Sequence, residues 1–268
     1  MENKYIIITG ATGGLGRAFC FNLARQNKNL ILSATKIERL EELKTEILAI
    51  NSKIDVVCKN CDMSSENSRN EFFKFLLDSK FCIEMLVNNA GYITEGEVEK
   101  ATRESLIQAV RVNCEGTIDL TKFIVDNHNE KEKLTILTVS SFAAFQPMPY
   151  MGIYGATKSF LLSFMSALRE EVKDKNITVS TVCPSGIYTT QAMKDAIASQ
   201  GLAGKLSSHD PEFIVSYVLK KAARGKAIII PGSFNRFTKF ISNFATYTMQ
   251  AKFVGKRWRK SQEKRKII

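Results

Sequence analysis

The chain has 268 residues, of which 44% are hydrophobic, and this suits one large α/β domain or two small ones with an ample core. No apolar run approaches the roughly 20 residues that a membrane-spanning helix needs. Only Met-Glu-Asn-Lys precedes the first apolar run, which is too little for a signal peptide. We therefore expect a cytoplasmic protein.

The net charge of +11 is unevenly distributed. Residues 233–268 contain ten Lys and Arg and one Glu, a net charge of +9, which leaves +2 for residues 1–232. The basic residues thus belong to the end of the chain, which argues against a nucleic-acid groove across the domain. The six cysteines include one C-x-x-C, Cys58 and Cys61, with no second pair, so we expect buried free thiols and no metal site.

Segments typical of strands and of helices alternate along residues 1–232, which we interpret as one domain. Short apolar, β-branched runs predict strands at residues 5–9, 30–34, 54–58, 85–88, 134–140, 178–183 and 227–230. Longer segments between them predict helices at residues 15–26, 37–50, 67–77, 103–125, 152–172 and 211–223. Strands that are apolar on both faces and alternate with helices indicate right-handed β-α-β crossovers. The expected fold class is α/β, a doubly wound, Rossmann-like parallel sheet of about seven strands in three α/β/α layers.

The first predicted strand leads into the first helix through Thr9-Gly-Ala-Thr-Gly-Gly-Leu-Gly16. Gly10 permits a tight turn, Gly14 lets the backbone approach a pyrophosphate, and Gly16 lets helix and strand pack closely. The phosphates would face the unpaired N–H groups at the positive end of the helix. A glycine-rich turn at the first strand-to-helix junction of an alternating chain therefore predicts a dinucleotide site.

Tyr154 and Lys158 stand one helical turn apart, so their side chains share a helix face. An ammonium group beside a phenol favours the phenolate and lowers its pKa. Ser141 directly follows the strand predicted at 134–140, and its hydroxyl is expected to meet that helix across a cleft. These three residues form a candidate site for proton transfer to or from an oxygen atom. Taken alone, the Tyr/Lys spacing is also typical of an exposed helix face.

The glycine turn, Asn88-Asn-Ala-Gly91, Asn113, Ser141 and the Tyr154/Lys158 pair occur in the order typical of one family. In these motifs, the chain resembles the short-chain dehydrogenase/reductase family from about Lys4 to Gly232. The resemblance implies an oxidoreductase that moves a hydride between C4 of a nicotinamide and the carbon of a ketone or secondary alcohol.

The resemblance also implies four catalytic roles. Tyr154 matches the general acid/base, and Lys158 matches the residue that bonds the nicotinamide ribose and helps to lower the phenol pKa. Ser141 matches the hydroxyl that orients the substrate oxygen, with Ser140 as the nearby alternative. Asn113 matches the residue that holds a water molecule in a proton relay toward the lysine.

The cofactor contacts that the resemblance implies come from several strand ends. They are Gly10, Thr12, Gly14, Leu15, Gly16, Ser33, Thr35, Lys36, Asp62, Met63, Asn89, Ala90, Gly91, Tyr154, Lys158, Pro184, Ile187 and Thr189. The usual Pro-Gly pair is Pro184-Ser185 in this chain. The end of the second strand carries no acidic residue, which in NAD(H) enzymes would bind the ribose 2′-OH. Lys36, Thr35, Ser33 and Arg17 would serve a 2′-phosphate instead, although the arginine common in NADP-using relatives is Thr35 here. We therefore expect NADP(H) rather than NAD(H).

The substrate mouth is expected to consist of residues 142–151 and 190–210. The first segment is strongly apolar for a loop. The second carries Met193, Ile197, Leu202 and Leu206 among small residues, which predicts a mobile lid. An apolar mouth favours a small, hydrophobic carbonyl or alcohol substrate. The alternative interpretation is that these side chains pack on neighbouring protein.

Residues 233–268 predict a helical, amphipathic and basic C-terminal extension. An apolar stripe is followed by the basic runs 256–260 and 264–266; the stripe consists of Phe237, Ile241, Phe244, Thr248, Ala251 and Val254. We expect residues 237–244 to pack on the domain and the extension to cover the edge of the last strand. That favours a homodimer, built through the helices at 103–125 and 152–172, over a tetramer. The final basic run would contact its own domain, a partner or an anionic membrane surface.

Two other functions are compatible with parts of the sequence. One is a catalytically idle NADP(H)-binding sensor or scaffold, although an idle fold has no need of Asn113, Ser141, Tyr154 and Lys158 together. The other is an enzyme at a membrane surface that acts on lipid-derived ketones, which the C-terminal extension alone suggests.

Overall fold

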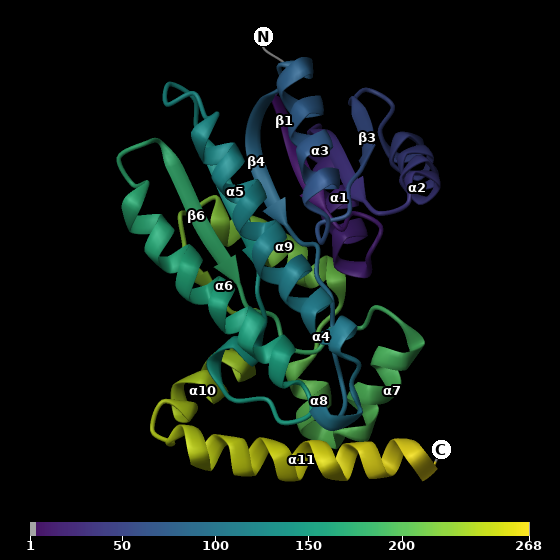
Figure 1. Ribbon diagram of the computed structural model, residues 1–268, viewed down its shortest axis with the longest axis vertical. Helices are drawn as coiled ribbons and strands as arrows, with labels where there is room; N and C mark the ends of the chain where they lie inside the picture. The colour runs from purple at the N-terminus through teal and green to yellow at the C-terminus, as the bar shows by residue number, and fades with distance from the viewer. Residues whose placement is uncertain (1–3, 268) are drawn as a thin grey trace.

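The computed structural model describes residues 4–267 of the chain. One parallel sheet has the strand order β3-β2-β1-β4-β5-β6-β7 (Figure 1). Its strands are β1 (Lys4–Thr9), β2 (Asn29–Ala34), β3 (Val56–Asn60), β4 (Cys82–Asn88), β5 (Leu134–Val139), β6 (Ile177–Val182) and β7 (Ile228–Ile229). The order reverses between β1 and β4, and in such sheets ligands bind at the carboxyl ends of the strands beside that reversal.

Helices cover both faces of the sheet. They are α1 (Gly14–Arg25), α2 (Ile37–Ile50), α3 (Glu66–Ser79), α4 (Arg103–Val110), α5 (Gly116–Asp126), α6 (Gly152–Glu171), α7 (Gln191–Ser199), α8 (Gly201–Ser207) and α9 (Pro211–Ala222). Side chains alternate along a strand, so Ile6 and Ile8 join the core under α1, α2 and α9. Tyr5 and Ile7 join the core under α3, α5 and α6. The predicted doubly wound α/β fold is confirmed.

Four elements differ from the prediction. The strand expected at 85–88 begins three residues earlier, at Cys82. The strand expected at 54–58 lies two residues later, at Val56–Asn60, and the last strand is only Ile228–Ile229. The helix expected at 103–125 is divided into α4, a π-helical turn over Arg111–Glu115, and α5. Gly116 follows that turn, where a Cβ atom would lie 2.4 Å from the carbonyl oxygen of Met63. The helix therefore packs very closely on the segment after β3.

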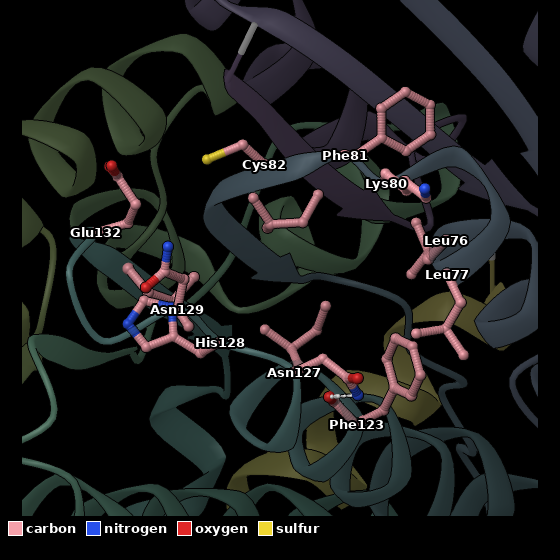
Figure 2. A pocket seen from close by; sticks show the side chains of 13 residues that line it. Leu76, Leu77, Lys80, Phe81, Cys82, Phe123, Asn127, His128, Asn129 and Glu132 are labelled. Carbon is pink, nitrogen blue, oxygen red and sulfur yellow. Dashed lines mark hydrogen bonds between the residues drawn. The ribbon is translucent and has the colours of Figure 1, made fainter. Parts of the chain in front are cut away.

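A pocket of about 240 Å³ lies at the amino end of β4, beside the ends of α3 and α5 (Figure 2). Leu76, Leu77 and Phe81 line it together with Phe123 and the imidazole of His128. The residues around it include none of the predicted site residues. The predicted site residues lie instead at the carboxyl ends of the strands, as the position of Ser141 after β5 shows.

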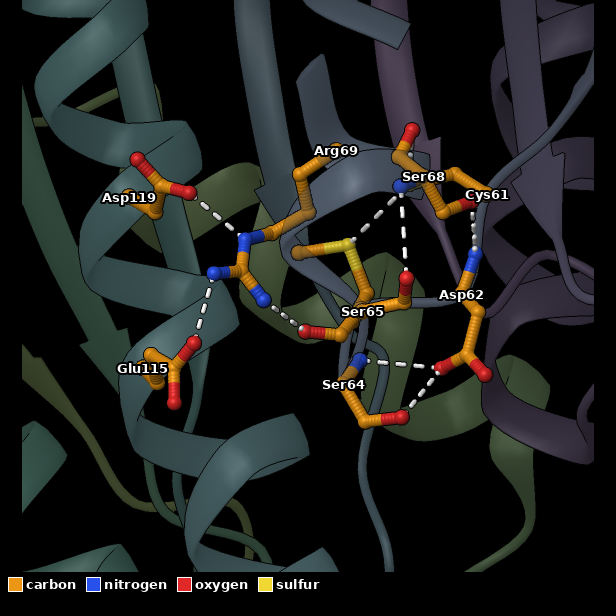
Figure 3. Close-up of polar contacts among 9 residues, drawn as sticks. Cys61, Asp62, Ser64, Ser65, Ser68, Arg69, Glu115 and Asp119 are labelled. Carbon is orange, nitrogen blue, oxygen red and sulfur yellow. Dashed lines mark hydrogen bonds and ion pairs between the residues drawn. The ribbon is translucent and has the colours of Figure 1, made fainter. Parts of the chain in front are cut away.

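A buried arginine joins α3 to α5 (Figure 3). The side chain of Arg69 is 3% exposed, and its Nε and Nη2 atoms each lie 2.6 Å from a carboxylate oxygen, of Asp119 and Glu115 respectively. Its Nη1 atom donates to the carbonyl oxygen of Met63 at 2.8 Å. One guanidinium group thus fixes two helices and the segment that carries Asp62 and Met63.

The C-terminal extension forms α10 (Ser233–Ser242) and α11 (Tyr247–Ile267). In Figure 1, α11 runs across the carboxyl-end side of the domain; it packs on α7, and α10 packs on α8. The expectation that the extension covers the sheet edge is therefore wrong for α11. The side chains at 261–268, including the basic run 264–266, lie outside the described residues. Within the described part of the chain, no helix is long and apolar enough to cross a membrane.

The expected packing of residues 237–244 on the domain is also wrong. Phe237 is 63% exposed, Ile241 is 50% exposed and Phe244 is 76% exposed. An apolar helical stripe predicts which residues share a face but not what that face contacts.

The cysteine prediction is confirmed for four of the six thiols. All six are free, with Cys20, Cys61, Cys114 and Cys183 buried. Cys58 and Cys82 are only half-buried. The single C-x-x-C pair thus consists of two free thiols, one in the middle of β3 and one just after it.

Candidate active site

Ser140 and Ser141 stand at the carboxyl end of β5 and have different surroundings. The Ser140 hydroxyl donates to the Lys158 carbonyl oxygen at 2.7 Å and so ties the strand end to α6. The Ser141 side chain lines a pocket together with Tyr154 and accepts a hydrogen bond from the Ala143 N–H at 3.1 Å. The hydroxyl that faces the pocket is thus the one that the spacing to Tyr154 favours.

Lys158 lies behind the phenol on the same face of α6. It is 4% exposed, and its ammonium donates to the Val139 carbonyl oxygen at 2.8 Å. The nitrogen lies 5.8 Å from the centre of the Tyr154 ring. Burial lowers the pKa of Lys158 to about 8.

The environment of Tyr154 differs from the expectation. Burial raises the pKa of its phenol, and a hydrogen bond with Ser141 opposes that rise. In the chain by itself this pKa is therefore raised, and a fall caused by Lys158 together with a positively charged nicotinamide stays a prediction. The Lys158 ammonium donates its hydrogen bond to the Val139 carbonyl oxygen, and desolvation is the largest influence on the phenol.

We predict that stability depends on pH through Lys158. Its folded pKa of about 8 is below the ordinary 10.5, so the unfolded chain binds more protons between these values. The destabilising contribution of the buried ammonium is complete below the folded pKa and disappears as the pH rises toward 10.5. The stability difference between the wild type and Lys158→Met should therefore change across this window. Urea denaturation of both proteins would measure it, and a constant difference would contradict the prediction.

Asn113 stands in the π-helical turn and is fully buried. Its Oδ1 accepts from the Tyr92 N–H at 2.7 Å, and its Nδ2 donates to the Tyr92 carbonyl and to Thr157 Oγ1, each at 2.9 Å. The amide thus fixes the segment after β4 against α6, the helix that carries Tyr154 and Lys158. Such π-helical turns often occur at functional sites. Its part in a water relay stays a prediction.

The glycine turn has the shape that the sequence predicts, with one addition. Gly10 has φ +61°, and a Cβ on Gly16 would lie 2.2 Å from the Gly10 carbonyl oxygen. A Cβ on Gly14 would lie 2.4 Å from Cγ2 of Thr189, so Gly14 makes room for this side chain. The cap residue Gly13 offers no side-chain hydrogen bond to the first N–H groups of α1. These groups therefore fit the pyrophosphate of a dinucleotide.

Two further predicted contacts support this turn or lie beside it. The Asn89 side-chain amide donates to the Thr9 and Gly10 carbonyls, each at 3.0 Å, so it holds the turn. Asp62 accepts from the backbone N–H and the hydroxyl of Ser64 at 2.9 and 2.7 Å (Figure 3). Its carboxylate is thereby held at the carboxyl edge, just after β3.

The candidates for a 2′-phosphate are reduced to two. Ser33 is only 1% exposed, and Arg17 forms an ion pair with Glu46. Thr35 and Lys36 are exposed at the start of α2. The lysine is therefore the cation at the end of β2 that remains available to a cofactor.

The segment after β6 completes the cofactor side. The Pro184 carbonyl accepts from the Phe142 N–H at 2.7 Å, so the backbone here is held although Ser185 replaces the usual glycine. Ile187 pairs with His209 in an isolated bridge. Thr189 is the residue that lies against Gly14.

A pocket of about 250 Å³ opens beside Tyr154 and Ser141. Both predicted mouth segments line it, the second through Met193 and Ile197. Leu202 and Leu206 instead are 73% and 49% exposed, on α8, the second of the two helices in this segment. The role of the segment as a mobile lid stays a prediction.

The remaining wall of this pocket comes from the C-terminal extension, which sequence reasoning missed. Seven of its residues line the pocket: Phe234, Asn235, Thr238, Phe253, Val254, Arg257 and Trp258. Arg257 also donates to the Gln200 side-chain oxygen at 3.0 Å and so ties α11 to the end of α7. The periodicity of the extension predicts its helices, but no signal in it predicts that they line the pocket beside Tyr154.

Comparison with solved structures gives the same fold. A structure from work on 7β-hydroxysteroid dehydrogenase stereoselectivity has a TM-score of 0.84 at 20% identity, covering 94% of this chain and 96% of that chain. A short-chain dehydrogenase from Sphingobium yanoikuyae in complex with NADPH has a TM-score of 0.76 at 23% identity, covering 90% and 93%. A short-chain dehydrogenase/reductase from Burkholderia phymatum in complex with NAD has a TM-score of 0.78 at 19% identity, also covering 90% and 93%.

Comparison of sequences identifies the family. The very-long-chain 3-oxoacyl-CoA reductase of Aspergillus oryzae is 29% identical over 226 residues. These cover 83% of this chain but 63% of the relative, so the chain spans less than two thirds of that protein's length. The profile of the family described as short chain dehydrogenase matches residues 4–200, which is well over half of the chain. The protein therefore belongs to the short-chain dehydrogenase family.

Proposed function

We propose that this chain is an NADP(H)-dependent oxidoreductase that interconverts a hydrophobic ketone and a secondary alcohol. The observation that carries the proposal is the pocket in which the Tyr154 phenol and the Ser141 hydroxyl meet apolar walls, with the buried Lys158 behind them. The glycine turn supports it, because its open N–H groups fit a dinucleotide. A nicotinamide bound there would give or take the hydride.

In the direction of reduction, the phenol of Tyr154 donates its proton to the substrate oxygen. The raised pKa of Tyr154 keeps the phenol protonated, which is the state that a general acid needs. The Ser141 hydroxyl, held at the end of β5, donates a hydrogen bond to the same oxygen. Lys158 holds the cofactor ribose and offers positive charge behind the phenol, while Asn113 keeps the pocket wall in place. Together these groups stabilise the negative charge that develops on the oxygen.

The pocket walls support a hydrophobic substrate. Phe142, Met148, Met193, Ile197 and Phe253 all line the pocket that Tyr154 faces. The relative from Aspergillus oryzae is named for a 3-oxoacyl-CoA, which is a ketone on a long apolar chain. A ketone of this chemical class is therefore the first to test.

The experiment is a panel of carbonyl compounds assayed with NADPH and with NADH. It includes 3-oxoacyl thioesters, steroid ketones and aromatic ketones, and oxidation of the cofactor is followed by its absorbance. We expect reduction of at least one hydrophobic ketone, faster with NADPH. Cofactor binding without turnover of any carbonyl or alcohol would instead support the idle sensor or scaffold.

We predict that Lys36→Ala weakens the use of NADPH selectively. Loss of one charge-assisted contact to a 2′-phosphate should raise the KM for NADPH by about tenfold and leave the KM for NADH unchanged. Lys53→Ala is the matched control, since Lys53 is exposed in the turn that follows α2. An equal change for both cofactors, or none, would contradict the role of Lys36.

We also propose a homodimer through α4, α5 and α6. Ile107 and Val110 on α4 and Phe160 on α6 are each about 40% exposed, and α4 contacts α6. Three large apolar side chains on adjoining helices are typical of a surface that another copy covers.

A further inference from the structure

The helix α10 is amphipathic, but its apolar side faces away from the protein. Phe237, Phe240 and Ile241 share one side of it, and Phe244 follows in the turn just after the helix; we name these four residues the α10 face. Their exposure ranges from 50% to 76%. Asn235, in contrast, is buried and donates to the Ser207 and Pro231 carbonyls, each at 2.9 Å. In an ordinary amphipathic surface helix the apolar side chains are buried and the polar ones are exposed, whereas here the apolar side chains are exposed and Asn235 is buried.

Hydrogen bonds hold this arrangement in place. The Gln250 side-chain amide of α11 donates to the Ser242 and Ala245 carbonyls at 2.8 and 2.9 Å, which fixes the turn between the two helices. Exposed apolar side chains continue into α11, where Tyr247 is 66% exposed and Phe253 is 71% exposed. The α10 face is therefore presented outward by defined contacts.

The charge of the same segment indicates what covers this face. Residues 233–260 contain seven Lys and Arg and no Asp or Glu. Apolar aromatic rings in a segment with an excess of cations match the interface of a bilayer with anionic headgroups. A second copy of the chain would instead bring two segments of net charge +9 together.

We propose that the α10 face binds peripherally to a lipid bilayer that carries anionic headgroups. The aromatic side chains of the face enter the interfacial region, and the cations of α10 and α11 neutralise the headgroups. The proposal concerns binding only and does not depend on the reaction that the pocket catalyses.

The test is co-sedimentation of the full chain with vesicles of phosphatidylcholine, with and without phosphatidylserine. We expect binding to the anionic vesicles and much weaker binding to the neutral ones. The double variant Phe237→Ser/Phe244→Ser should reduce the partition coefficient about 100-fold, since each buried phenylalanine contributes about tenfold. Neither residue lines the catalytic pocket. A truncation at 232 is unsuitable because it also removes a wall of that pocket.

The matched control is Ile50→Ser/Leu77→Ser, which removes two exposed apolar side chains from α2 and α3. This variant should bind vesicles like the wild type. Equal binding by the α10 variant and the wild type would overturn the proposal, and so would equal binding to neutral and anionic vesicles. Light scattering without lipid should give the same mass for the wild type and the α10 variant. A smaller mass for the variant would assign the face to self-association instead.

Discussion

Replacing Tyr154 with phenylalanine is expected to lower kcat by about a thousandfold while cofactor binding remains intact. A positioned general acid contributes roughly 100- to 10,000-fold to rate, and only the hydroxyl is removed by this change. The ring still fills its half-buried site on α6, so the fold should not change. The measurement is steady-state reduction of the best ketone from the panel, beside NADPH binding followed by fluorescence.

The control for this variant is Tyr92→Phe. Tyr92 lies beside the site and its backbone is bound by Asn113, but its side chain is exposed. It should therefore keep the wild-type rate. A loss of less than about tenfold in Tyr154→Phe would show that another group delivers the proton. The same comparison separates an enzyme from an idle cofactor-binding protein, since an idle protein has no turnover for either change to lower.

Arg69→Met is expected to lower the free energy of unfolding by about 3 kcal/mol. The substitution leaves the carboxylates of Glu115 and Asp119 and the carbonyl oxygen of Met63 without their shared partner. The carboxylates are 50% and 39% exposed, so water compensates part of the loss and the effect stays near the low end for a broken buried pair. Urea denaturation followed by circular dichroism measures it.

Lys74→Met provides the comparison on the same helix. Lys74 pairs with Asp78 one turn away, but the two side chains are 75% and 63% exposed. Exposed pairs of this kind contribute only about 0.3–0.5 kcal/mol, so this variant should unfold close to the wild type. Similar losses of unfolding free energy in the two variants would mean that the buried ion pairs of Arg69 stabilise the fold no more than an exposed pair does.

The fold could be predicted from the sequence because the strand pattern, the alternation with helices and the glycine turn all indicate the same fold. Strands that are apolar on both faces require helices on both sides of the sheet, and the glycine turn marks the first crossover. The close approaches at Gly10 and Gly16 follow from the same requirement. Ser141 and Tyr154 could be placed together because the carboxyl end of a strand and the start of the next helix lie at one edge of the sheet.

Other features depend on contacts between distant segments, and no local pattern predicts these. The π-helical turn at Asn113 directly precedes Gly116, where the helix lies so close to Met63 that only a glycine fits. The pKa of Tyr154 depends mainly on desolvation of its phenol, and the spacing between Tyr154 and Lys158 in the sequence does not predict this desolvation. The apolar stripe after 233 predicts packing of residues 237–244 on the domain, because such a stripe is usually covered, but the structure turns these residues outward.

Because α10 and α11 lie beside the pocket, the polar residues of the site and one wall of the pocket come from different parts of the chain. Tyr154, Ser141 and the glycine turn all fall within residues 4–200, which the family profile matches. The wall that contains Phe234, Val254 and Trp258 lies beyond residue 200. Under the proposed function, substrate preference can therefore diverge through the last two helices while the proposed catalytic residues stay the same. Exchange of residues 233–268 between relatives is accordingly a route to redesigned specificity that leaves these residues untouched.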